Sequence, residues 1–247
     1  MNRRSLSVCL ASLLALSPLV SQEETDQEEV EPPKPPKPVA TVDIKNSRQG
    51  GTPGGTTSKE GKWTVDAESK TLQIGVEPLV DGWLEFGPEF REKPGTIKGA
   101  GRAPGDARIQ SRFGIGLYGP NGFQIRLIPA WNKVELVRRG EALKAIDFEL
   151  DVETVYEMEL AVLEEEEVWQ LKARIWPTEG ERPEEPTMKY QFPKSELLFP
   201  LAGRAVLTAT PFSGEPVEFS SAEVFEGEYV PVPAESEDDS EEAGSEE

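Results

Sequence analysis

Residues 113–137 alternate apolar side chains with polar or small ones in three short runs, and this pattern constrains the fold more than any other feature of the chain. The first two runs, 113–118 and 123–128, flank the turn Gly119-Pro120-Asn121-Gly122. Proline presets the backbone angle at the second turn position, and asparagine and glycine tolerate positive φ angles. Because residues two apart share one face of a strand, the pattern predicts a β-hairpin followed by a third antiparallel strand at 134–137.

Similar runs recur along the chain between turn-forming residues. Residues 157–167 contain many helix formers, but Met158, Leu160 and Val162 alternate with polar or small residues, which favours a strand. The glycine-rich segment 50–57 is expected to be a flexible loop. Further strands are predicted at 41–44, 62–65, 71–77, 83–86, 96–101, 143–148, 156–163, 168–176, 188–192, 204–210 and 217–224.

About a dozen short strands, with turns about every 8–12 residues, are typical of sandwiches and barrels. The predicted fold class is therefore all-β: a two-sheet antiparallel β-sandwich of the jelly-roll type. We expect one such domain over 41–225, which is long enough to bury a core without disulfides.

The N-terminal residues have the composition of an export signal. The basic pair Arg3-Arg4 precedes an apolar run at 6–20. This order and length predict a signal peptide over 1–21 that is removed from the mature chain. An uncleaved membrane anchor is the alternative, but the run is shorter than the roughly 20 apolar residues that a span needs, and Pro18 interrupts it.

Acidic segments flank the expected domain. Residues 22–40 hold six acidic and two basic side chains together with five prolines, which favours an extended, disordered linker. Residues 226–247 are dominated by acids and serine, and they lack the apolar side chains that folding requires. This segment is expected to be a disordered tail. The net charge of −20 argues against nucleic acid and against anionic membranes as partners.

Cys9 is the only cysteine, and histidine is absent. Because Cys9 lies in the expected signal peptide, the mature chain would contain no disulfide, no thiolate nucleophile and no cysteine ligand. The lack of histidine excludes Ser-His-Asp and Cys-His catalysis and removes the commonest zinc ligand. Carboxylate catalysis, oxygen ligation of calcium and plain binding remain. We expect no cofactor, with calcium at Asp81-Gly82 as the weaker alternative.

Five segments follow one another along the chain: Trp63-Thr64-Val65, Asp81-Gly82-Trp83, the hairpin, the run that ends at Trp176, and the final run from Pro216. Their succession resembles the concanavalin A-like lectin/glucanase group of secreted bacterial domains. Laminin G-like modules and the 3-keto-disaccharide hydrolase domain belong to this group. The resemblance covers most of 41–225 and implies an exported jelly roll that is often associated with glycans. Such a fold does not fix a function.

The run Glu149-Leu150-Asp151-Val152-Glu153 resembles the catalytic signature of family 16 glycoside hydrolases. On a strand, its three carboxylates would share one face. The resemblance implies Glu149 as nucleophile, Glu153 as acid/base and Asp151 as their electrostatic partner, with carboxyls about 5 Å apart for retaining hydrolysis. We favour the alternative that this run is a solvated turn, because it lies between two strands where the alternation changes phase.

A second candidate site surrounds the hairpin. Gly114 and Gly116 leave one strand face nearly bare; Tyr118 is expected on that face, with Gln124 and Arg126 across from it. Sugars stack on aromatic rings and need fixed polar partners. The alternative is that the glycines relieve crowding in the sheet. The candidate ligand-binding residues are Tyr118, Gln124, Arg126 and Trp131, whereas Trp63, Trp83, Trp169 and Trp176 are expected in the core.

Three functions remain open. The favoured one is an exported (periplasmic or secreted) non-catalytic module that binds carbohydrate or a cell-envelope partner, without a stable membrane span after signal cleavage. The second is a glycoside hydrolase or 3-keto-disaccharide hydrolase that uses Glu149, Asp151 and Glu153. The third is a structural or protein-interaction domain without a small ligand.

Overall fold

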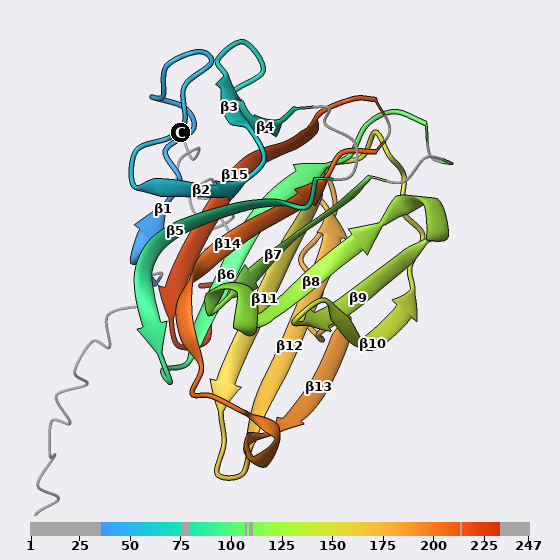
Figure 1. Cartoon of the computed structure of the whole chain (residues 1–247). Coiled ribbons are helices and arrows are strands. Elements are labelled where there is room, and N and C mark those ends of the chain that lie inside the picture. Colours follow the sequence, from blue (N-terminus) through green and yellow to red (C-terminus); the bar gives the residue numbers. More distant parts are fainter. Residues whose placement is uncertain (1–35, 76–79, 107, 109–110, 213, 233–247) are drawn as a thin grey trace, which may run out of the picture. The chain divides into compact units, whose positions relative to one another are not determined.

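The computed structural model describes residues 36–75, 80–106, 108, 111–212 and 214–232. They belong to one compact unit, Lys34–Glu247, and form two antiparallel sheets (Figure 1). No α-helix occurs among these residues, and the predicted fold class is confirmed. The expected signal peptide lies outside the described residues, as do most of the expected linker and of the acidic tail.

The eight-stranded sheet has the order β13-β12-β11-β6-β15-β4-β3, and β1 pairs with β15 beside this path. Its central strands are long and their inward positions are apolar, as expected for a sheet with one face in the core. The strands are β1 (Ala40–Thr41), β3 (Trp63–Asp66), β4 (Thr71–Ile74), β6 (Gly95–Arg102), β11 (Tyr156–Glu164), β12 (Val168–Pro177), β13 (Met188–Pro193) and β15 (Val217–Glu226).

The seven-stranded sheet has the order β10-β9-β8-β7-β14-β5-β2. Three single-turn 3-10 helices, η1 (Gly119–Asn121), η2 (Pro129–Trp131) and η3 (Lys194–Glu196), lie in the connections. The strands are β2 (Thr56–Glu60), β5 (Gly82–Arg91), β7 (Arg112–Leu117), β8 (Phe123–Ile128), β9 (Lys133–Arg138), β10 (Glu141–Asp147) and β14 (Ala202–Thr210).

The predicted hairpin is formed by β7 and β8. Ile115 lies opposite Ile125, and Leu117 lies opposite Phe123, so the apolar sides of both strands face the core together. The third predicted strand is β9, which pairs with β8. The strand predicted at 156–163, in a segment rich in helix formers, is confirmed as β11, which ends at Glu164.

Apolar side chains from both sheets fill the space between them. Two aromatic contacts join the sheets directly: the rings of Phe113 and Phe219 have centroids 6.3 Å apart, and those of Phe123 and Phe192 lie 5.3 Å apart. Burial of such large rings supplies much of the free energy of folding.

Three segments differ from the sequence-based expectation. The strand predicted at 41–44 is only two residues long, Ala40–Thr41. The prediction of a loop over 50–57 is wrong for its last two residues, because β2 begins at Thr56. This strand pairs with β5 at the sheet edge and has mostly exposed side chains, so it lacks the apolar alternation by which other strands were found. At the other terminus, the packed chain continues past Phe225. Thr96 Oγ1 donates to the Gly227 carbonyl at 2.7 Å, and the rings of Phe225 and Tyr229 lie 4.9 Å apart.

Among the described residues, no helix has the length and apolar character needed to cross a bilayer.

Candidate functional site

The outer face of the seven-stranded sheet is built from alternate residues of five neighbouring strands. Cross-strand pairing sets these residues in rows. Because neighbouring strands lie about 4.8 Å apart, the side chains of one row act as a continuous surface. One row consists of Trp83, Thr208, Gly114, Arg126 and Glu135, and the next of Glu85, Val206, Gly116, Gln124 and Val137.

Two glycines of β7 occupy the middle of this surface. A Cβ atom on Gly114 would lie 1.9 Å from the backbone oxygen of Ile125, and one on Gly116 would lie 2.5 Å from Cγ of Gln124. The glycines therefore relieve crowding in the sheet, as the alternative interpretation of the sequence held. They also leave no side chain between Thr208 and Arg126, so the centre of the outer face is recessed.

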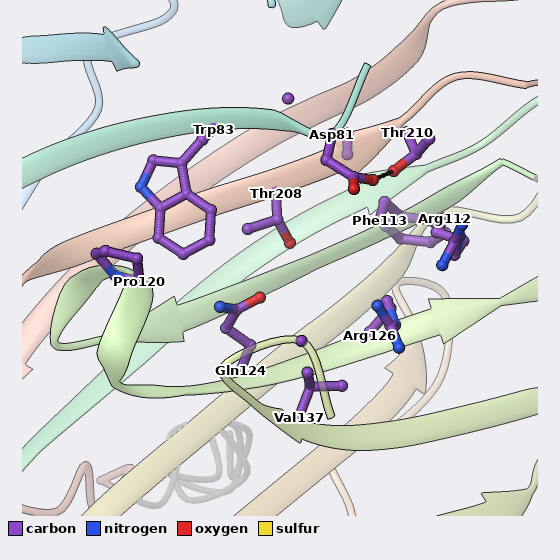
Figure 2. A pocket seen from close by; sticks show the side chains of 13 residues that line it. Asp81, Trp83, Arg112, Phe113, Pro120, Gln124, Arg126, Val137, Thr208 and Thr210 are labelled. Carbon is purple, nitrogen blue, oxygen red and sulfur yellow. Dashed lines mark hydrogen bonds between the residues drawn. The ribbon is translucent and has the colours of Figure 1, made fainter. Parts of the chain in front are cut away.

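A groove of about 260 Å³ crosses this face. Figure 2 shows Trp83 and Pro120 at one end, and Asp81, Thr210 and Arg112 at the other. The side chains of Gln124, Arg126 and Val137 line one flank between the two ends. We call this feature the sheet groove; its lining is completed by Gly82, Phe113, Gly140, Thr208 and Ala209.

Neighbouring residues hold the polar groups of the sheet groove in place. The hydroxyl of Thr210 donates to Oδ1 of Asp81 at 2.6 Å. Arg126 donates through Nη2 and Nε to Oε2 of Glu135, at 2.6 and 3.1 Å. Since these side chains are already oriented, a ligand would lose little affinity to ordering them.

Arg112 lies directly opposite Thr210 in the sheet. Its guanidinium stands 5.7 Å from the ring centroid of Phe212, and within the described part of the chain no carboxylate forms an ion pair with it. It therefore differs from Arg126, whose charge is balanced by Glu135.

Of the predicted ligand-binding residues, the structure brings Gln124 and Arg126 together in the sheet groove. Trp131 is exposed at 55%, but it lies on η2 and outside the groove lining.

The prediction for Tyr118 is wrong. Its backbone has a left-handed φ of 65°, which breaks the strand alternation and turns the ring into the core. The side chain is fully buried; it packs on Trp169 and Phe90, and its hydroxyl donates to the Lys93 carbonyl at 2.5 Å. Burial raises the pKa of the phenol well above its usual range.

Trp83 is the aromatic residue that the sequence-based prediction missed. It was assigned to the core with the other tryptophans; Trp63 and Trp169 do lie in the core, and Trp176 is buried outside that cluster. Trp83 is half-buried and lies on the outer face. The alternation within β5 contained the signal, because Leu84 and Phe86 point inward and Trp83 must then share the polar side with Glu85.

The alternative catalytic site does not have the geometry that its chemistry requires. Glu149, Asp151 and Glu153 are exposed in the connection between β10 and β11. Asp151 Oδ1 accepts a hydrogen bond from the Glu153 backbone at 2.7 Å, which is typical of a turn. The three carboxylates are therefore not aligned on a strand, and the interpretation as a solvated turn is the one that the structure supports.

Asp81 was also the candidate calcium ligand. Its carboxylate has Thr210 as a partner. The described residues contain no group of three or more acidic side chains placed to hold a metal ion.

Comparison with solved structures identifies the class of fold. Lectin II from Ulex europaeus superposes with a TM-score of 0.55 at 8% identity, covering 77% of this chain and 100% of that chain. Peanut lectin with a 9mer peptide gives a TM-score of 0.53 at 11% identity, covering 75% and 96%. At such identities the likeness concerns the fold alone, and it confirms a concanavalin A-like β-sandwich. No family model matches the chain, and no curated protein is similar to it.

Proposed function

We propose that this chain is an exported, non-catalytic module that binds carbohydrate in the sheet groove. The observation that carries the proposal is the groove itself, whose lining combines an aromatic ring, Trp83, with fixed hydrogen-bonding groups. Saccharides present apolar ring faces and many hydroxyls, and they need both kinds of partner.

Each part of the sheet groove has a role in this proposal. The half-buried Trp83 offers a ring face for one sugar. Gln124 and Thr208 can donate to and accept from hydroxyl groups. Asp81 is acceptor-only, and its second oxygen can bind a hydroxyl because, among the described residues, only Thr210 donates to this carboxylate, through the first oxygen. The likeness to lectins agrees with this function, but it is the groove of this chain that supports it.

Export is part of the same proposal and rests on the N-terminal sequence, a basic pair followed by an apolar run. We infer a bacterial source from the sequence resemblance and place the mature chain in the periplasm or outside the cell. Terminal sequencing of protein recovered from an expressing bacterium tests this. A mature chain that begins near Gln22 would support export, and an intact Met1 in the cytoplasm would overturn it.

The binding experiment uses the full chain on a panel of oligosaccharides and polysaccharides, with tryptophan fluorescence or calorimetry as the readout. Trp83→Ala should weaken binding strongly, because the stacking surface is lost. Trp131→Ala is the matched control: this tryptophan is exposed and lies outside the sheet groove. Loss of binding in Trp131→Ala alone would move the site to η2. No binding across the panel would overturn the proposal and favour a protein-interaction domain.

A further inference from the structure

The charged side chains of the sheet groove differ in whether an opposite charge neutralises them. Arg126 is neutralised by Glu135, with Nη2 and Oε2 2.6 Å apart and both side chains largely shielded from solvent. Asp81 is held by the neutral hydroxyl of Thr210. Arg112 contacts the ring of Phe212 and forms no ion pair with the described residues. A guanidinium that has no carboxylate partner in the described part of the chain thus lies at one end of a groove in a strongly acidic protein.

Position makes Arg112 suitable for a ligand. It is half-buried, it lines the sheet groove, and it lies opposite Thr210 on the same outer face as Gly114 and Gly116. A ring contact such as that with Phe212 restricts the guanidinium without neutralising it. Because the planar fork of arginine matches carboxylate and sulfate oxygens in bidentate fashion, this end of the groove is preorganised for an anionic group.

The distance between the two ends sets the size of the ligand. Trp83 pairs with Thr208, which is two residues from Thr210, the residue opposite Arg112. Two strand spacings and a two-residue rise give about 12 Å between the backbones at Trp83 and Arg112. Because the two side chains also lie at opposite ends of the groove (Figure 2), this span suits a short oligosaccharide rather than a single sugar ring.

We propose that the sheet groove selects an oligosaccharide with an anionic group, whose carboxylate or sulfate binds Arg112 while a sugar ring stacks on Trp83. This inference rests on the proposed function. Asp81, at the same end of the groove (Figure 2), would bind a hydroxyl and repel a misplaced anion, and so fix the direction in which the saccharide lies. Carboxylated and sulfated sugars present the same kind of anionic group to Arg112, and the experiment distinguishes between them.

The experiment compares saccharides that differ only in charge. A trigalacturonate is measured against its methyl ester, and a sulfated trisaccharide against its desulfated form, by calorimetry on the full chain at low and high salt. The wild-type chain should bind one charged member at least about tenfold more tightly than its neutral partner, because hydrogen bonds to charged groups are the stronger ones. High salt should reduce this preference.

Three variants separate the contributions. Arg112→Gln should remove the preference for the charged member while neutral binding persists. Trp83→Ala should weaken binding of both members. Arg91→Gln is the charge-matched control, because Arg91 is an exposed cation of β5 that pairs with Glu89 outside the groove; it should change neither affinity. Thermal unfolding of each variant shows whether the fold is retained.

The outcomes distinguish the anionic selectivity from the carbohydrate-binding function. Equal binding of charged and neutral members by the wild-type chain, or an unchanged preference in a folded Arg112→Gln, would overturn the anionic selectivity and leave the carbohydrate-binding function standing. Failure of every saccharide to bind would overturn the function and the selectivity together. A preference restricted to one pair identifies the carboxylate or the sulfate as the bound group.

Discussion

The carboxylate of Glu159 on β11 lies 2.7 Å from Nη1 of Arg174 on β12, and both side chains are almost fully buried. Glu159 faces outward from the eight-stranded sheet, away from the core. Arg182 completes the charge cluster by donating through Nη2 and Nε to the same carboxylate at 2.7 and 2.9 Å. The guanidinium of Arg174 also donates to the Glu184 carbonyl at 3.1 Å. These contacts fasten the β12–β13 connection over the outer face.

Removal of Glu159 should be strongly destabilising. Glu159→Ala leaves two arginines without their shared counter-charge, and loss of one partner of a buried ion pair costs about 3–5 kcal/mol of unfolding free energy. Urea unfolding measures this cost. The control is Glu185→Ala in the same connection, where the carboxylate pairs with Lys189 but is 85% exposed, so solvent screens the pair and its loss should change stability little. Similar losses in the two variants would contradict the buried role of Glu159.

Gly114 should be intolerant of a side chain. A Cβ atom there would meet the backbone oxygen of Ile125 at 1.9 Å, and a backbone atom cannot move aside without distorting the β7–β8 pairing. We expect Gly114→Ala to cost about 1–3 kcal/mol, the usual range for overpacking. Gly54→Ala is the matched control, because no atom lies within 4 Å of its Cβ position and its φ is not left-handed. Chemical denaturation of both variants decides whether crowding is the cause.

Most of the strands could be predicted because the alternation of apolar and polar residues can be read within each strand and shows which face packs against the core. Where one face of a strand is buried, the apolar residues must recur every second position, and strands such as β6, β11 and β14 were found within a residue or two of their ends. β2 was missed because both of its faces are polar and exposed. The pairing of strands that are far apart in sequence, such as β6 with β15, could not be predicted from the residues of either strand alone.

The candidate site was predicted only in part, and backbone geometry explains the difference. Gln124 and Arg126 were found because the hairpin register follows from the turn. Tyr118 was misplaced because the alternation ends one residue earlier, where a left-handed φ redirects the side chain. The outward direction of Trp83 could be read from the alternation in β5, but its place in the sheet groove with Asp81 depends on the long-range pairing of β5 with β14.

Tyr118 should matter for stability and not for ligand binding. Tyr118→Phe keeps the ring contacts with Phe90 and Trp169 but removes the hydroxyl that donates to the Lys93 carbonyl. We expect a loss of about 0.5–1.5 kcal/mol in unfolding free energy, the net contribution of one hydrogen bond, with saccharide affinity unchanged. Thermal unfolding and calorimetry on the same sample test both parts. A Tyr118→Phe variant that loses affinity while staying folded would return this residue to the site.

The contribution of Glu157 to folding stability should decrease as pH rises. Burial raises the pKa of its carboxyl above the ordinary value of 4.5, and this effect outweighs the opposing attraction of Lys98. The unfolded chain therefore releases this proton at a lower pH than the folded chain does. Its contribution to stability is fully present below the ordinary pKa and is lost as pH rises through the raised value.

Glu157→Gln should remove this loss, so the variant should unfold at a higher temperature than the wild-type chain at pH 7 and at nearly the same temperature at pH 3. Glu185→Gln should show the opposite trend, because the hydrogen bond from Lys189 lowers the pKa of that carboxyl. Its stabilisation exists above the ordinary pKa and disappears as pH falls. Thermal unfolding of both variants between pH 3 and pH 7 compares the two signs directly. A pH-independent difference for Glu157→Gln would show that the substitution acts through packing rather than through charge.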